Sequence, residues 1–150
     1  MKNWLILCFW LMGACSLFGQ GRFEGLWEGE MTFGGLYSEQ KYRFQLWLQE
    51  KGGAIKGRSY VYLQPEKVIE MEIKGSIYND LSIYLRDITF IETVKGSFQP
   101  PFKRKYQLLF KRTIWETALE GYWQEILDTP MDDKRALGRI KLQKVKTMKP

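Results

Sequence analysis

Residues 41–63 of the chain read KYRFQLWLQEKGGAIKGRSYVYL. Apolar and polar residues alternate on both sides of Gly52-Gly53, which is the period of two half-buried β-strands. Two successive glycines suit a two-residue turn in which both residues have positive φ. Such a turn places the apolar residues of both strands on one face, and this agreement predicts a β-hairpin. The expected cross-strand pairs are Leu48 with Gly57, Leu46 with Ser59, Phe44 with Val61 and Tyr42 with Leu63.

A short phrase, a glycine followed closely by an aromatic or β-branched residue, recurs along the chain. The copies are Gly25-Leu26-Trp27, Gly57-Arg58-Ser59-Tyr60, Gly75-Ser76-Ile77, Gly96-Ser97-Phe98, Gly121-Tyr122-Trp123 and Gly138-Arg139-Ile140. Each lies where apolar and polar residues alternate, and no stretch shows a sustained helical period with caps. The chain is therefore expected to be all-β, a single antiparallel up-and-down meander closed into a barrel of about eight to ten strands with little helix.

Several local signals predict how the other strands pair. A three-residue bulged hairpin at Tyr78-Asn79-Asp80 would align the apolar residues that follow with those of the preceding strand. A break in the alternation predicts a bulge near Asp87, and a turn around Ile114-Trp115 sets Arg104 opposite Glu125. Further strands are expected over residues 23–33, 68–77, 81–91, 103–112, 117–126 and 137–145, with or without a short strand over 93–98.

The first and last strands carry complementary charges. Glu28 and Glu30 lie on the outer face of the first, and Arg139 and Lys141 lie on the outer face of the last. Pairing the two strands would set opposite charges side by side and remove both free edges of the sheet. This pattern predicts closure of the barrel.

Residues 1–20 have the features of a secretory signal peptide. A basic Lys2 precedes the apolar run Trp4–Met12, which is too short to span a bilayer, and small residues follow. Cleavage near Gly19 or Gln20 is favoured. The alternative is lipidation at Cys15, and the product would then be an outer-membrane lipoprotein. The mature domain is then residues 21–146 with a frayed tail at 147–150, exported to the periplasm or secreted, and without a transmembrane segment.

The composition excludes several kinds of chemistry. The 150 residues include no histidine, and both cysteines, Cys8 and Cys15, lie in the leader. A Ser-His-Asp triad and His- or Cys-based zinc sites are therefore excluded. We expect no catalytic residue, metal or cofactor. The formal net charge is +6, and basic stretches such as residues 103–105 could attract an anionic surface or polymer.

Three motifs resemble those of the calycin group of lipocalin- and avidin-type barrels, and of bacterial exported lipocalin-like proteins of unknown role. They are Gly25-Leu26-Trp27 in the first strand, Leu119-Glu120-Gly121-Tyr122-Trp123 in the penultimate strand and Gly138-Arg139-Ile140-Lys141-Leu142 in the last. A lipocalin usually carries a disulfide, which this mature chain cannot form. The resemblance implies a barrel with a cavity for a small ligand.

The inward polar and aromatic positions are the candidate ligand site. They are Trp27, Tyr42, Ser59, Asp87, Tyr106 and Trp123, with Arg104 and Glu125 expected as an ion pair at the rim. Aromatic walls with a few polar groups are what a ligand cavity needs. The alternative is that these side chains simply pack the core of a small barrel.

A second candidate surface lies outside the barrel, where aromatic and basic side chains interleave. Its residues are Arg43, Trp47, Arg58, Tyr60 and Tyr62, with Trp47 opposite Arg58 as a cation–π candidate. Exposed aromatics beside arginine suit a protein or glycan partner. The alternative is an outer face covered by a loop.

Two functions follow. The first is an exported, non-catalytic, lipocalin-like barrel that binds a small apolar or amphipathic molecule inside. The second is a cell-envelope module with a filled barrel whose outer aromatic and basic face binds a protein or glycan. Neither involves nucleic acid, and membrane contact is expected only if Cys15 is lipidated.

Overall fold

The computed structural model describes residues 21–92, 98–128 and 135–146. Within these ranges the chain forms eight strands and no helix, so no helix there could cross a membrane. The strands are β1 (Gly25–Thr32), β2 (Lys41–Lys51), β3 (Ala54–Gln64), β4 (Lys67–Ile77), β5 (Ser82–Phe90), β6 (Arg104–Arg112), β7 (Thr117–Glu125) and β8 (Leu137–Lys144).

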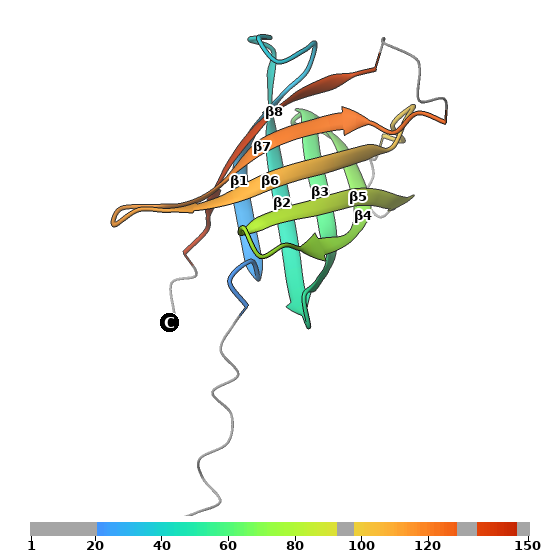
Figure 1. Cartoon of the computed structure of the whole chain (residues 1–150). Helices are drawn as coiled ribbons and strands as arrows, with labels where there is room; N and C mark the ends of the chain where they lie inside the picture. The colour runs from blue at the N-terminus through green and yellow to red at the C-terminus, as the bar shows by residue number, and fades with distance from the viewer. Residues whose placement is uncertain (1–20, 93–97, 129–134, 147–150) are drawn as a thin grey trace, which may run out of the picture.

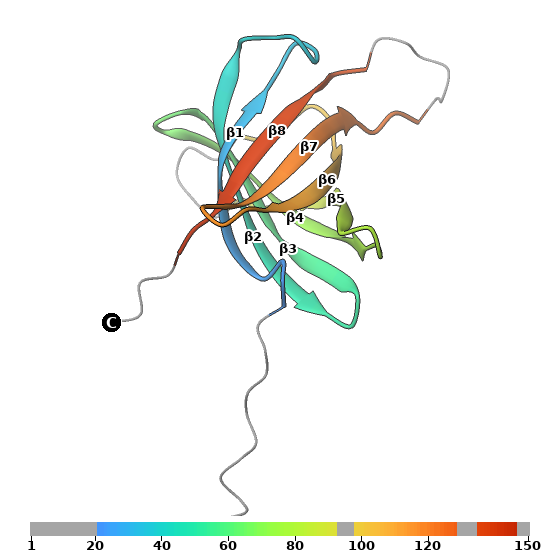
Figure 2. The ribbon, with the colours of Figure 1, turned by 60° about the vertical axis from the view of Figure 1, so that its left-hand side comes forward.

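The strands form one closed antiparallel barrel (Figures 1 and 2). Each strand pairs with the next along the chain, and β1 pairs with β8. The all-β meander predicted from the sequence is therefore confirmed, with the smallest of the expected strand counts. This architecture is consistent with the calycin-like fold that the motifs implied. The leader, the tail and all of the expected 93–98 strand except Phe98 lie outside the described residues.

The β2–β3 hairpin has the predicted turn and register. Gly52 and Gly53 have φ values of 58° and 79°, which is the left-handed region that a two-residue hairpin turn requires. Residues Lys51 and Ala54 pair across it. The predicted pairs Leu48 with Gly57, Leu46 with Ser59 and Phe44 with Val61 are all present.

The β6–β7 register and the barrel closure are also confirmed. Arg104 lies opposite Glu125, and Tyr106 opposite Trp123, as the short turn predicted. At the closure, Glu30 of β1 lies opposite Lys141 of β8. The ion pairs of the β1 glutamates run to the other neighbour, β2. They join Glu28 to Arg43 at 2.6 Å and Glu30 to Lys41 at 2.7 Å.

The β4–β5 connection differs from the expectation. The loop comprises Asn79, Asp80 and Leu81, closed by a hydrogen bond from the Tyr78 N–H to the Ser82 carbonyl (2.9 Å). The Asp80 carboxylate accepts hydrogen bonds from the backbone and hydroxyl of Ser82, which fixes this turn.

The consequence is a register shift of two residues. Leu81 takes a left-handed conformation (φ 65°) and points to solvent, so the prediction that it faces inward was wrong. Ile77 therefore pairs with Ile83. The bulge predicted near Asp87 is confirmed, because the β4–β5 register shifts where Asp87 pairs with Ile73.

Large aromatic and aliphatic side chains are buried in the barrel interior. Trp27 and Trp123 are fully buried, and their indole N–H groups donate to the carbonyls of Phe23 and Thr32 at 2.8 Å. Burial of this apolar surface provides the main stabilisation of the fold. The fully buried large side chains also include Arg104, Tyr106, Phe23, Phe44, Met31, Leu46, Leu48, Met71, Ile73 and Ile83.

Candidate functional site

The expected cavity residues pack against other aromatic rings. Trp123 lies between Phe33 and Phe102, with ring centroids 4.7 and 6.1 Å away. Other ring pairs in the interior, at 5.1–6.2 Å, are Phe33–Tyr42, Phe44–Tyr106 and Trp27–Phe110. These separations are typical of packed aromatic cores. Trp27, Tyr42 and Trp123 therefore each pack against at least one other aromatic ring.

The inward polar residues form one buried cluster around Asp87. Its carboxylate accepts hydrogen bonds from the backbone N–H of Arg104 (2.9 Å), from Arg104 Nε (3.0 Å) and from the Tyr106 hydroxyl (2.8 Å). Asp87 and Arg104 are both almost inaccessible to solvent. Asp87 shares the inward face of β5 with Ile83 and Leu85, and its carboxylate forms this ion pair with Arg104 at the start of β6.

The prediction of an ion pair between Arg104 and Glu125 at the rim was wrong. The two residues pair across β6 and β7, but Arg104 lies inside the barrel and binds Asp87. The Glu125 carboxylate instead accepts a hydrogen bond from the Ala136 N–H at 3.0 Å. The physical reason is that a buried guanidinium needs a buried counter-charge.

Two buried polar atoms in this region have no hydrogen-bond partner among the described residues. They are Ser59 Oγ and Arg104 Nη2. Buried groups of this kind are usually satisfied by water or a bound polar molecule.

The cluster predicts a pH dependence of stability. Burial raises the pKa of Tyr106 well above its ordinary value, because the ionised phenolate would be desolvated. A phenol whose pKa is raised in the folded state stabilises the fold fully below its unfolded pKa of about 10. That contribution is lost as the pH rises toward the folded pKa. We expect a Tyr106→Phe variant to lose less stability above about pH 10 than the wild type, measured by urea unfolding across pH. Equal alkaline losses in both proteins would contradict this assignment.

The outer patch expected on β2 and β3 is present but internally paired. Arg43 lies over the Tyr62 ring at 4.9 Å and also binds Glu28. Arg58 binds Glu70 at 2.9 Å, although it also lies opposite Trp47 as predicted. The Tyr60 hydroxyl and Glu70 raise the pKa of Arg58. Both arginines therefore already have partners.

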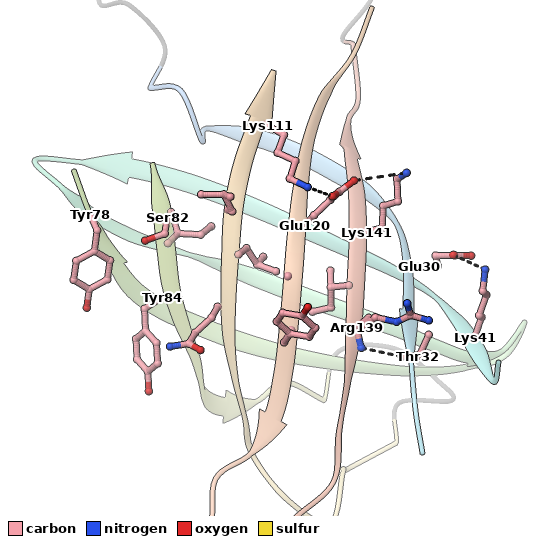
Figure 3. Close-up of a pocket in the computed structure, with 17 residues that line it drawn as sticks. Glu30, Thr32, Lys41, Tyr78, Ser82, Tyr84, Lys111, Glu120, Arg139 and Lys141 are labelled. Carbon is pink, nitrogen blue, oxygen red and sulfur yellow. Dashed lines mark hydrogen bonds and ion pairs between the residues drawn. The ribbon is translucent and has the colours of Figure 1, made fainter. Parts of the chain in front are cut away.

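A hollow of about 760 Å³ lies on the outer surface over β5–β8 and continues onto β1 (Figure 3). Tyr78 and Tyr84 stand at one side of the view, and Arg139 and Lys41 stand at the other. The floor of the hollow is a row of outward side chains that lie opposite one another on neighbouring strands. The row runs Tyr84, Gln107, Tyr122 and Arg139 on four consecutive strands.

Charged side chains also line the hollow. Glu120 binds both Lys111 and Lys141, and its hydrogen bond with Lys111 is the main cause of a lowered pKa. Arg139 makes no ion pair with any described residue, and its backbone N–H donates to Thr32 Oγ1 at 2.8 Å. The hollow therefore combines aromatic rings, an amide and one available guanidinium.

The sequence did not identify this hollow. Its floor depends on the β5–β6 register, and these strands are joined by a long segment with Pro100-Pro101 rather than a tight turn. Tyr84, Gln107 and Tyr122 each lie between inward-facing residues of their own strands. No local signal showed that they lie side by side.

Neither the metal-ligating side chains nor comparison with known proteins points to a function. Across residues 21–92, 98–128 and 135–146, no group of three or more acidic, His or Cys side chains is placed to hold a metal. Comparison of the chain with protein-family models, characterised proteins and solved structures found no match.

Proposed function

We propose that this protein is an exported, non-catalytic, lipocalin-like barrel that binds a glycan chain on its outer surface. The observation that carries the proposal is the hollow over β5–β8, with Tyr84 and Tyr122 in its floor. The packing of the interior adds support, because an apolar or amphipathic ligand among the buried side chains would have to displace some of them.

The side-chain chemistry of the hollow favours a sugar polymer. Tyrosine rings present flat apolar faces with a polar edge, which complements the mixed apolar and hydroxyl surface of a sugar ring. Gln107 lies between Tyr84 and Tyr122 in the row, and Arg139 follows Tyr122, so hydrogen-bonding groups alternate with rings. Other small barrels bind oligosaccharides on a strand face.

Binding should depend on the two tyrosines. We expect the double variant Tyr84→Ala with Tyr122→Ala to bind soluble polysaccharide at least about tenfold more weakly, because aromatic anchors dominate such surfaces. The measurement is retardation in affinity gels containing dextran, xylan or polygalacturonate. Tyr37→Ala is the control, since Tyr37 is 92% exposed and outside the hollow. A wild type that none of the polymers retards, or equal losses in the control, would refute the proposal.

A small ligand in the interior is the second candidate. The observation favouring it is the pair of unsatisfied buried atoms, Ser59 Oγ and Arg104 Nη2. Such a ligand would be small and polar, which differs from the apolar molecule expected from the sequence. Native mass spectrometry of the purified protein tests this candidate. A spectrum that shows only the bare chain mass would reject it.

A further inference from the structure

Four basic residues lie directly opposite one another on four adjacent strands. Lys56 of β3 pairs with Lys74 of β4, Lys74 pairs with Arg86 of β5, and Arg86 pairs with Lys105 of β6. All four occupy outward positions of their strands, and Lys56, Lys74 and Arg86 are exposed. We call these four residues the basic row. At the spacing of neighbouring strands it spans about 14 Å.

The basic row is an exception on this protein. Like charges directly opposite one another destabilise a sheet, and opposite charges stabilise it. Elsewhere on the outer face five ion pairs join basic residues to carboxylates: Lys41–Glu30, Arg43–Glu28, Arg58–Glu70, Lys111–Glu120 and Lys141–Glu120. In the basic row only Lys74 has an acidic partner among the described residues, Glu72 at 3.6 Å. Three adjacent like-charge pairs with only one neighbouring carboxylate, that of Glu72, indicate a surface that binds an anion.

The basic row borders the glycan-binding hollow. Arg86 is two residues from Tyr84 on β5, and Lys105 is two residues from Gln107 on β6. Residues two apart on a strand share a face and lie about 7 Å apart along it. A chain lying across the strands can therefore place rings on the tyrosines and charged groups on the basic row at the same time.

We propose that the glycan is acidic, a polysaccharide whose carboxylate groups bind the basic row. This inference rests on the proposed function and names the class of its ligand. Each of the four strands contributes one basic side chain to the row. The distance between neighbouring strands is comparable to the length of one sugar residue in a polymer, so successive sugar carboxylates can meet successive basic side chains. Three of the four charges are lysines, which act as point charges and do not require one fixed anion geometry.

The test compares two triple variants with the same change in net charge. The first, Lys56→Gln with Arg86→Gln and Lys105→Gln, removes most of the basic row. The control replaces Lys51, Lys67 and Arg112 by Gln; these are exposed residues outside the row that make no ion pair with described residues. Binding to polygalacturonate, dextran and a single-stranded DNA of equal charge is measured at several salt concentrations.

We expect the basic-row variant to bind polygalacturonate at least tenfold more weakly than wild type and the control to lose less than threefold. The slope of log affinity against log salt should fall by about 1 for each row residue replaced. Dextran should bind more weakly than polygalacturonate to the wild type. The row variant should also be as stable as the wild type or more stable, because its repulsive pairs are gone.

Three outcomes would overturn the inference, and they have different meanings. If both triple variants keep polygalacturonate binding and the Tyr84/Tyr122 variant loses it, the glycan surface stands and the acidic ligand is wrong. If no polysaccharide binds to the wild type, the proposed function fails as well. If the DNA binds as tightly as polygalacturonate with the same loss in the row variant, the surface is a general polyanion site and the polysaccharide assignment is wrong.

Discussion

Replacing Asp87 by alanine should lower the free energy of unfolding by about 3–5 kcal/mol, which is the usual cost of removing one partner from a buried ion pair. Asp87 accepts three hydrogen bonds, two from Arg104 and one from Tyr106, and all three groups are buried. Without the carboxylate, a guanidinium with no counter-charge remains in the core. The measurement is equilibrium unfolding in urea at neutral pH.

A second variant separates the charge from the packing. Asp87→Leu combined with Arg104→Met removes both charges, and we expect it to be clearly more stable than Asp87→Ala, because apolar replacements of a buried pair are often nearly neutral. Glu125→Gln should change stability by less than about 1 kcal/mol, since Glu125 does not bind Arg104. A large loss in Glu125→Gln, with little in Asp87→Ala, would mean that the rim ion pair expected from the sequence exists after all.

The parts of the fold that the sequence predicts well are joined by short turns. In β2–β3 the turn residues Gly52-Gly53 fix the register, and in β6–β7 only four residues separate the strands. The apolar periodicity then has one register that buries both faces. The closure of β1 on β8 followed from charge and from the need to cover both edges.

The candidate site depends on strand registers that the apolar periodicity does not determine. At β4–β5 the periodicity accepts registers that differ by two residues, because such a shift keeps every side chain on its own face. Asp80 selects the actual register through its hydrogen bonds to Ser82. The expected loop would have set Lys74 opposite Tyr84 rather than Arg86, so the basic row could not be identified from the sequence. The Asp87–Arg104 pair was likewise hidden, because it joins two strands across a long loop.

Gly75→Ala should destabilise the barrel by about 3 kcal/mol or more, at the upper end for overpacking. A Cβ placed on Gly75 would lie 1.8 Å from the carbonyl oxygen of Tyr84, which belongs to the backbone of β5. Backbone in a closed barrel cannot move aside as a flexible side chain can, because a shift of β5 disturbs its pairing with both β4 and β6. The expected fall in Tm, followed by circular dichroism, is about 10 °C.

Two controls distinguish this contact from general effects of substitution. Ser76→Ala, at the adjacent exposed position, should change Tm by no more than a few degrees. Gly52→Asn should also be tolerated, because nothing lies within 4 Å of its Cβ position and asparagine accepts the left-handed conformation found there. If Gly75→Ala is instead as stable as the wild type, β4 and β5 do not approach each other in this register. The alignment of Lys74 with Arg86 would then fail with it, so this single substitution also tests the basis of the proposed acidic-glycan surface.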